Sequence, residues 1–146
     1  MNLPAYLKSL GYIEVPFTVT RVNHIVVHAR VNGEEVVLIV DTGASRTCIA
    51  GSSAERLGLT SGRVEKVAVS FALPKKTKAL SKLKSLDIGS LHLANFETWL
   101  VDFSYINMIV QMKGEEFCDG VLGADILKRT AAGIDYKCCK MYLKAA

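Results

Sequence analysis

The sequence predicts a single, mostly β domain with two short helices. Three observations support this fold class: a length of 146 residues, several stretches in which apolar and polar residues alternate, and turn-forming residues between those stretches. A chain of this length fits one domain with a real core, and alternation with a period of two is typical of strands with one buried face. Half of the residues are hydrophobic and 22% are charged, which is typical of folded globular proteins.

The first half of the chain has the clearest strand pattern. Val15–Thr20 and His24–Val31 both alternate and predict two strands. Asn32-Gly33 then supplies the dipeptide that most readily adopts the left-handed dihedrals of a tight hairpin turn. The returning segment, Glu34–Val40, ends as an aliphatic run without alternation. It is therefore expected to be a core strand with both faces covered.

The middle of the chain predicts a short helix and a long hairpin. Ser52–Glu55 has the spacing of a capping box, and Gly58 stands where a short helix ends. Loose alternation from residue 63 to residue 88 is interrupted around residues 74–78, which predicts a hairpin with a basic tip. The hairpin contains a run of five lysines, Lys75, Lys76, Lys78, Lys82 and Lys84, of which the first three lie at the predicted tip. Two interpretations stay open for this run: a solvated tip, or a site for phosphate or an acidic peptide.

The last third of the chain predicts fewer regular elements. Phe96–Val101 reads as a strand, and Asp102–Asp119 as a long loop with at most one short strand. Ala124–Arg129 has a short helical pattern, and Tyr136–Leu143 is expected to close the chain as a strand.

Composition limits the partners and the location. The longest aliphatic run, Val36–Val40, is far shorter than the roughly 20 residues of a transmembrane helix. The net charge is a modest +4, and the first residues lack the pattern of a signal peptide. We therefore expect a cytoplasmic protein whose partners include neither nucleic acid nor membrane.

The cysteines and histidines form no standard metal motif. The four cysteines are Cys48, Cys118, Cys138 and Cys139. They include no Cys-x-x-Cys pair, so we expect reduced thiols, no metal and no cofactor. The adjacent Cys138 and Cys139 are either redox-active or, as we prefer, one buried and one exposed thiol. His24 and His28 lie on a predicted strand, so we expect them to face solvent rather than to bind a metal.

A short polar motif, Asp41-Thr42-Gly43-Ala44-Ser45, directly follows the aliphatic strand. A buried strand would hold the Asp41 carboxylate rigidly, Gly43 would let backbone approach it, and Thr42 would hydrogen-bond nearby. This arrangement suits activation of a water molecule. The alternative is an ordinary turn in which Asp41 caps local amides.

The order hairpin, Asp-Thr-Gly-Ala and short helix resembles the retropepsin-like aspartic protease family, and Leu57-Gly58-Leu59 stands where the helix of that family ends. Asp119–Leu127 resembles its second landmark, in which Val121, Leu122 and Gly123 pack beside the catalytic loop. Ile134–Tyr136 and Met141–Leu143 resemble its closing strands. The likeness covers roughly residues 22–143.

This resemblance implies a single-lobe, retropepsin-like closed β-barrel over residues 22–146, preceded by an extension and first strand over residues 1–21. It implies that Asp41 is catalytic and that Thr42, Gly43 and Ala44 support the active-site loop. Two such carboxylates are needed close together, so that they share one proton. Because the chain has a single Asp-Thr-Gly, a homodimer would supply the second by symmetry.

The resemblance also places a flap between the catalytic loop and the later strands. The candidate flap residues are Phe71, Pro74, Lys75, Lys76, Thr77 and Lys78. No glycine occurs between Gly62 and Gly89, whereas flaps of this family usually contain glycines near the tip.

The function implied is an aspartic endopeptidase that acts on peptide or protein substrates. Two rivals keep the fold without the chemistry: a module that binds an extended peptide by strand addition, and a structural dimerisation domain. The glycine-free flap favours these rivals, and the intact Asp-Thr-Gly favours catalysis.

Overall fold

The structure, a computed structural model, describes residues 2–62, 64–67 and 76–145. The strands are β1 (Tyr12–Pro16), β2 (Thr18–Val19), β3 (Ile25–Val31), β4 (Glu34–Val40), β5 (Cys48–Ala50), β6 (Val64–Val67), β7 (Lys76–Ile88), β8 (Leu91–Val101), β9 (Gly120–Leu122), β10 (Gly133–Asp135) and β11 (Lys140–Lys144). The helices are α1 (Leu3–Ser9), α2 (Ser104–Met112), α3 (Ala124–Arg129) and the 3-10 helix η1 (Gly51–Ser53).

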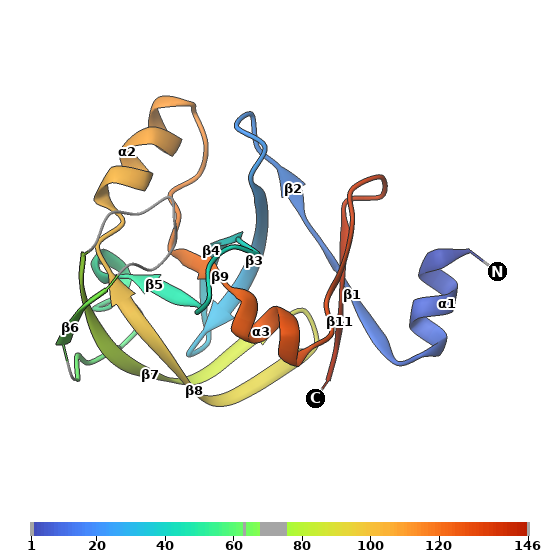
Figure 1. The fold of residues 1–146 in the computed structure, drawn as a ribbon, viewed down its shortest axis with the longest axis horizontal. Helices are drawn as coiled ribbons and strands as arrows, with labels where there is room; N and C mark the ends of the chain where they lie inside the picture. The colour runs from blue at the N-terminus through green and yellow to red at the C-terminus, as the bar shows by residue number, and fades with distance from the viewer. Residues whose placement is uncertain (1, 63, 68–75, 146) are drawn as a thin grey trace.

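Six strands form a closed barrel. The larger sheet has the order β2-β3-β4-β9-β5-β8-β7-β6, and an additional pairing between β3 and β7 joins its two halves. Strands β3, β4, β9, β5, β8 and β7 therefore surround a common core (Figure 1). Leu38, Leu86 and Leu122 are fully buried there. This arrangement confirms the mostly β, retropepsin-like barrel predicted from the sequence.

The hairpin that leads to the candidate site is confirmed. β3 and β4 pair in antiparallel register from Ile25↔Val40 to Val31↔Glu34. Asn32 and Gly33 form the turn, with φ of 51° and 83°, as the left-handed preference of this dipeptide predicts. The Asn32 side chain also accepts hydrogen bonds from the backbone of β7 and donates one to the Leu57 carbonyl. The turn is thereby fixed to the barrel.

A smaller sheet joins the two ends of the chain. β11 lies in its centre, with β1 along one edge and β10 along the other. This sheet lies at one end of the molecule, with α1 outermost (Figure 1). Met141, Tyr142 and Leu143 of β11 are buried. The division of the chain between residues 21 and 22 stays a prediction.

The closing strand begins later than expected. Tyr136–Leu143 was predicted as one strand, but residues 136–139 form a turn between β10 and β11. The Asp135 carboxylate accepts hydrogen bonds from the backbone of Lys137 and Cys138 and so stabilises this turn. Cys139 has a φ of 52°, which no strand residue adopts. The side-chain hydrogen bonds of Asp135 therefore outweigh the strand pattern.

The first predicted helix is wrong. The segment that begins at Ser52 forms η1 followed by turns, not an α-helix. The N-cap position of η1 is occupied by Ala50, without a side-chain hydrogen bond, rather than by Ser52 as the capping box predicted. The ending was predicted well, because Gly58 has the positive φ of 68° typical of a terminating glycine.

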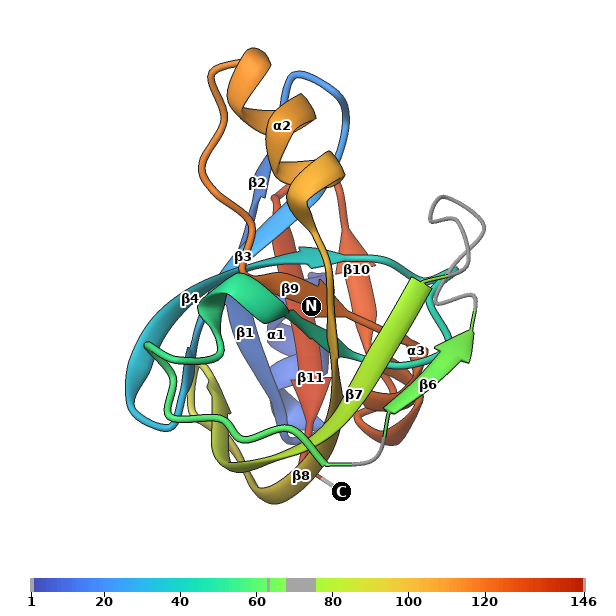
Figure 2. The same cartoon turned by 90° about the vertical axis from the view of Figure 1, so that its left-hand side faces the viewer.

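Two other helices occur where none was expected. α2 occupies part of the predicted loop Asp102–Asp119, and its buried Asn107 makes two hydrogen bonds to the backbone of Cys118. Figure 2 shows α2 at the top of the barrel, near the turn between β2 and β3. α1 begins with Asn2, whose side chain accepts from the Ala5 amide. None of the described helices is long and apolar enough to cross a membrane.

Candidate active site

Asp41 lies directly after β4, at the end of a buried strand. Its amide donates to the Leu122 carbonyl of the parallel strand β9 at 3.0 Å. The Gly43 amide donates to Asp41 Oδ1 at 2.9 Å, and the Ala44 amide donates to the Asp41 carbonyl at 3.1 Å. Asp41 is half-buried, while Thr42 and Gly43 are exposed. The Asp41 carboxylate is thus fixed by the loop backbone on one side and accessible to solvent on the other.

The second landmark lies against this loop. Val121 and Leu122 of β9 are buried, and Gly123 follows them. A Cβ atom on Gly123 would lie 2.6 Å from the Arg46 carbonyl carbon and 2.9 Å from the Ala44 oxygen. The Ala124 amide donates to the same Ala44 oxygen at 2.7 Å. The backbone of the loop therefore rests on Gly123, where only glycine fits.

A contact that the sequence analysis missed fixes the far end of the loop. Asp125, in the first turn of α3, accepts from the Thr47 amide at 3.0 Å and from the Thr47 hydroxyl at 2.7 Å. The Gly123 amide in turn donates to Thr47 Oγ1 at 3.0 Å. The only signal in the sequence was the position of Asp125 within the second landmark.

An open hollow of about 330 Å³ lies beside Asp41. It is lined by Asn23, His24, Ile25, Ile39, Val40, Asp41, Thr42, Ile134 and Tyr136. Ile134 belongs to β10 and Tyr136 follows it, so the hollow extends from the Asp-Thr-Gly loop to the edge of the smaller sheet. Tyr136 is 63% exposed. This hollow is large enough to receive several side chains.

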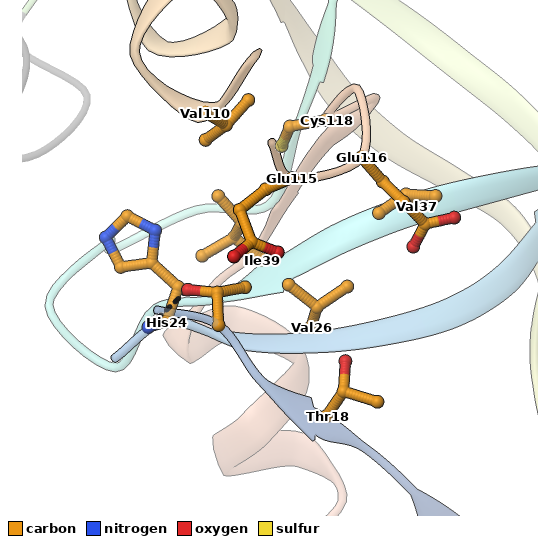
Figure 3. A pocket seen from close by; sticks show the side chains of 10 residues that line it. Thr18, His24, Val26, Val37, Ile39, Val110, Glu115, Glu116 and Cys118 are labelled. Atoms are coloured by element: carbon orange, nitrogen blue, oxygen red, sulfur yellow. Dashed lines mark hydrogen bonds between the residues drawn. The ribbon is translucent and has the colours of Figure 1, made fainter. Parts of the chain in front are cut away.

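A second hollow shares two lining residues, His24 and Ile39, with the first. Figure 3 shows Val26, Val37, Ile39, Val110 and Cys118 around it. Its volume of about 30 Å³ is close to that of one water molecule, so it offers no room for a substrate side chain. Nearby, His28 Nε2 lies 3.1 Å from Glu116 Oε2. In the part of the chain that the structure describes, no group of three or more His, Cys, Asp and Glu side chains could hold a metal ion.

The other aspartates considered are engaged elsewhere. Asp119 is buried and accepts from the Val37 amide, the Ser53 hydroxyl and the Arg56 guanidinium. Asp135 stabilises the turn described above. In contrast, the carboxylate of Asp41 makes a local backbone contact and borders an open hollow. It is the carboxylate best placed to meet a bound molecule.

The candidate flap is only partly described. Phe71, Pro74 and Lys75 lie outside the described residues. Lys76, Thr77 and Lys78 begin β7, and their backbones pair with Val67, Lys66 and Glu65 of β6. The hairpin predicted between the catalytic loop and the later strands therefore has two paired strands. Its role as a flap stays a prediction.

The buried cysteines are poor nucleophiles. Burial, with a smaller contribution from neighbouring Cys118, raises the pKa of the Cys48 thiol to about 12. Burial raises the pKa of Cys118 to about 11. On the surface, a hydrogen bond to Asp135 raises the pKa of Cys138. Because the thiolate is the reactive form, these three cysteines are poor candidates for a nucleophile near neutral pH.

The six-stranded barrel and its Asp-Thr-Gly loop define a single-lobe protein of the retropepsin-like fold. A sequence model of the family described as aspartyl protease matches residues 27–126, and the chain belongs to this family. A search of curated protein sequences found no significant match.

Solved structures share the fold at low sequence identity. A retropepsin-like aspartic protease from Rickettsia conorii is 20% identical with a TM-score of 0.58, and the match covers 92% of this chain and 90% of that one. The retroviral protease-like domain of Ddi1 from Leishmania major is 19% identical with a TM-score of 0.51, covering 82% and 85%. EIAV protease in complex with the inhibitor HBY-793 is 14% identical with a TM-score of 0.54, covering 81% and 98%.

Proposed function

We propose that the protein is an aspartic endopeptidase that acts as a homodimer and hydrolyses peptide bonds with a water molecule activated by two Asp41 carboxylates. The observation that carries this proposal is the position of Asp41. It follows a buried strand, its Oδ1 accepts from the Gly43 amide, and it borders a hollow of about 330 Å³. A fixed carboxylate at the wall of an open hollow is suited to act on a bound peptide.

A single carboxylate does not complete this chemistry. Two carboxylates held close together cannot both ionise readily, so they share one proton. One then takes a proton from the attacking water, while the other donates a proton toward the carbonyl of the peptide bond. Asp119, Asp125 and Asp135 are engaged in other hydrogen bonds. The second carboxylate is therefore assigned to Asp41 of another copy, related by a two-fold axis.

The exposed edge of β10 is the proposed contact with that copy. The closing strand β11, which contains Tyr142 and Leu143, was another candidate for the interface. Both of its edges are occupied, by β1 and β10, so it has no free edge for a second chain. Among the described residues, β10 has a pairing partner on one side only. Its Ile134 lines the same hollow as Asp41. Pairing along this edge would bring the second copy next to the catalytic loop, because unpaired strand edges readily accept another strand.

The test of the catalytic proposal is digestion of a peptide library at several pH values by the parent protein and by Asp41→Asn. The amide keeps the shape of the side chain but cannot act as a base. We expect cleavage by the parent protein and none by the variant, with the same thermal unfolding temperature for both. Equal cleavage by both proteins would refute the role of Asp41. Peptide binding without cleavage by either protein would favour the peptide-binding module.

The test of the contact surface is Tyr136→Glu. Tyr136 is exposed in the isolated chain. Its substitution by glutamate should therefore leave the fold intact while it places a charge at the proposed interface. Val19→Glu is the matched control, because Val19 is also exposed but lies on β2. Light scattering should show that Tyr136→Glu alone raises the dimer dissociation constant, by roughly tenfold or more. An unchanged dimer would exclude the β10 edge.

A further inference from the structure

Thr47 ends the catalytic loop and is tied into the protein by all of its polar groups. It is fully buried. Its amide and hydroxyl donate to Asp125, its hydroxyl oxygen accepts from the Gly123 amide, and its carbonyl accepts from the Thr98 hydroxyl at 2.9 Å. These contacts join the loop to α3, to the start of that helix and to β8.

Asp125 makes the largest contribution to this restraint. Its carboxylate accepts from the Thr47 amide, the Thr47 hydroxyl and its own neighbour, the Ile126 amide. All three partners are donors, so the site needs a group that only accepts. A carboxylate meets this need, and hydrogen bonds to a charged acceptor are stronger than those to a neutral one.

The restraint lies on the same short segment as Asp41. The loop is held at its start by the contact of Asp41 with Leu122, in its middle by the contact of Ala44 with Ala124, and at its end by Asp125. If the last contact is lost, Thr47 keeps only its hydrogen bonds with Gly123 and Thr98, and residues 45–47 can shift more easily relative to β9. Displacement of a catalytic group by about 1 Å can cost on the order of a hundredfold in rate.

We propose that Asp125 is a positioning residue, which holds the catalytic loop through Thr47 so that Asp41 keeps its productive orientation. This proposal rests on the proposed function, since it assigns Asp125 to the same reaction. Asp125 itself does not contact the substrate.

The central variant is Asp125→Asn. In this variant an NH2 group replaces one of the two carboxylate oxygens. The Thr47 amide donates to both of these oxygens, so one of its hydrogen bonds is replaced by two N–H groups that face and repel each other. Asp119→Asn is the matched control. Asp119 also accepts several hydrogen bonds, but its partners are Val37, Ser53 and Arg56 rather than the catalytic loop. Asp119 is buried, whereas Asp125 is half-buried.

Two readouts separate positioning from stability. The first is steady-state kinetics well below the unfolding temperature, corrected for the folded fraction. Asp125→Asn should lower kcat by about ten- to a hundredfold with KM changed by less than about threefold, because a positioning defect acts on the chemical step. Asp119→Asn should lower the unfolding temperature while kcat of the folded protein stays within about twofold of the parent.

The second readout does not require activity. Hydrogen exchange of the Thr47 amide, followed by NMR, should become faster by on the order of tenfold in Asp125→Asn and stay unchanged in Asp119→Asn. Thr47→Val, which lacks the hydroxyl, should also lower kcat, whereas Thr47→Ser, which keeps it, should retain most of it. In the double variant with Asp125→Asn, the loss from Thr47→Val should be smaller than in the parent, because the two side chains share one contact. The part of the loss that remains comes from the Gly123 amide, which Thr47→Val leaves without its acceptor.

Parent-like kcat in Asp125→Asn, or an equal loss of kcat in Asp119→Asn, would overturn the proposal. If the parent protein cleaves no peptide, the proposed function fails. Hydrogen exchange of the Thr47 amide then tests alone whether Asp125 holds the loop. Faster exchange at Thr47 in Asp125→Asn alone would then support a loop-positioning role, and unchanged exchange would overturn it.

Discussion

Substitution of Gly123 by alanine perturbs the packing that supports the Asp-Thr-Gly loop. The new Cβ would lie 2.6 Å from the carbonyl carbon of Arg46, 2.7 Å from its oxygen and 2.9 Å from the Ala44 oxygen. All three are backbone atoms and cannot rotate away, so the loop must move. Overpacking of this kind costs roughly 1–3 kcal/mol. With three contacts at once, we expect a loss of about 3 kcal/mol, or a fall of about 6–12 °C in Tm.

The assay is urea unfolding followed by the fluorescence of Trp99, combined with peptide cleavage. Trp99 is the single tryptophan of the sequence. It is buried and packs under the Arg46 guanidinium, so it reports on the loop itself. Gly51→Ala is the matched control, since its Cβ would meet the Val101 oxygen at an ordinary 3.7 Å. Equal stability and equal cleavage in the two variants would refute the conclusion that the loop rests on Gly123.

Two further predictions concern pH. The cleavage rate should decline at the alkaline end, because a carboxylate pair that shares one proton loses function once both groups ionise; a rate that still rises well above neutrality would point to another catalyst. Because burial raises the pKa of Cys48 from 9.0 to about 12, its stabilising contribution is complete below pH 9 and is lost as pH rises toward 12. The free energy of unfolding should fall by roughly 1 kcal/mol per pH unit across this window from this thiol. Chemical denaturation at pH 8 to 11 should show a shallower slope in Cys48→Ala, and an unchanged slope would refute the assignment.

The features predicted correctly from the sequence are those that depend on neighbouring residues. The turn at Asn32-Gly33 follows from the dihedral preferences of two residues, and the aliphatic run of β4 is enough to place Asp41 at a buried strand end. The start of α1 could also have been predicted, because Asn2 caps it and Pro4 lies in its first turn. These signals are local, so an isolated sequence contains them.

Apart from α1, the features that were missed depend on contacts with residues outside the element itself. α2 contains no charged residue, its N-cap position has no side-chain hydrogen bond, and it is fixed by the contact of Asn107 with Cys118. The contact between Thr47 and Asp125 joins positions 78 residues apart. Closure of the barrel likewise requires Arg30 of β3 to pair with Asp87 of β7. Propensity and periodicity contain no information on such pairings, which only the packed fold determines.

The shared use of Asp41 by two copies is tested most directly by mixing the parent protein with Asp41→Asn. In an equal mixture that has exchanged subunits, random pairing makes about one quarter of the dimers fully parental. If each active site needs both Asp41 carboxylates, the cleavage rate per parent subunit falls to about half of its value in the pure protein. A rate per parent subunit that stays unchanged on mixing, while native mass spectrometry shows mixed dimers, would contradict the account.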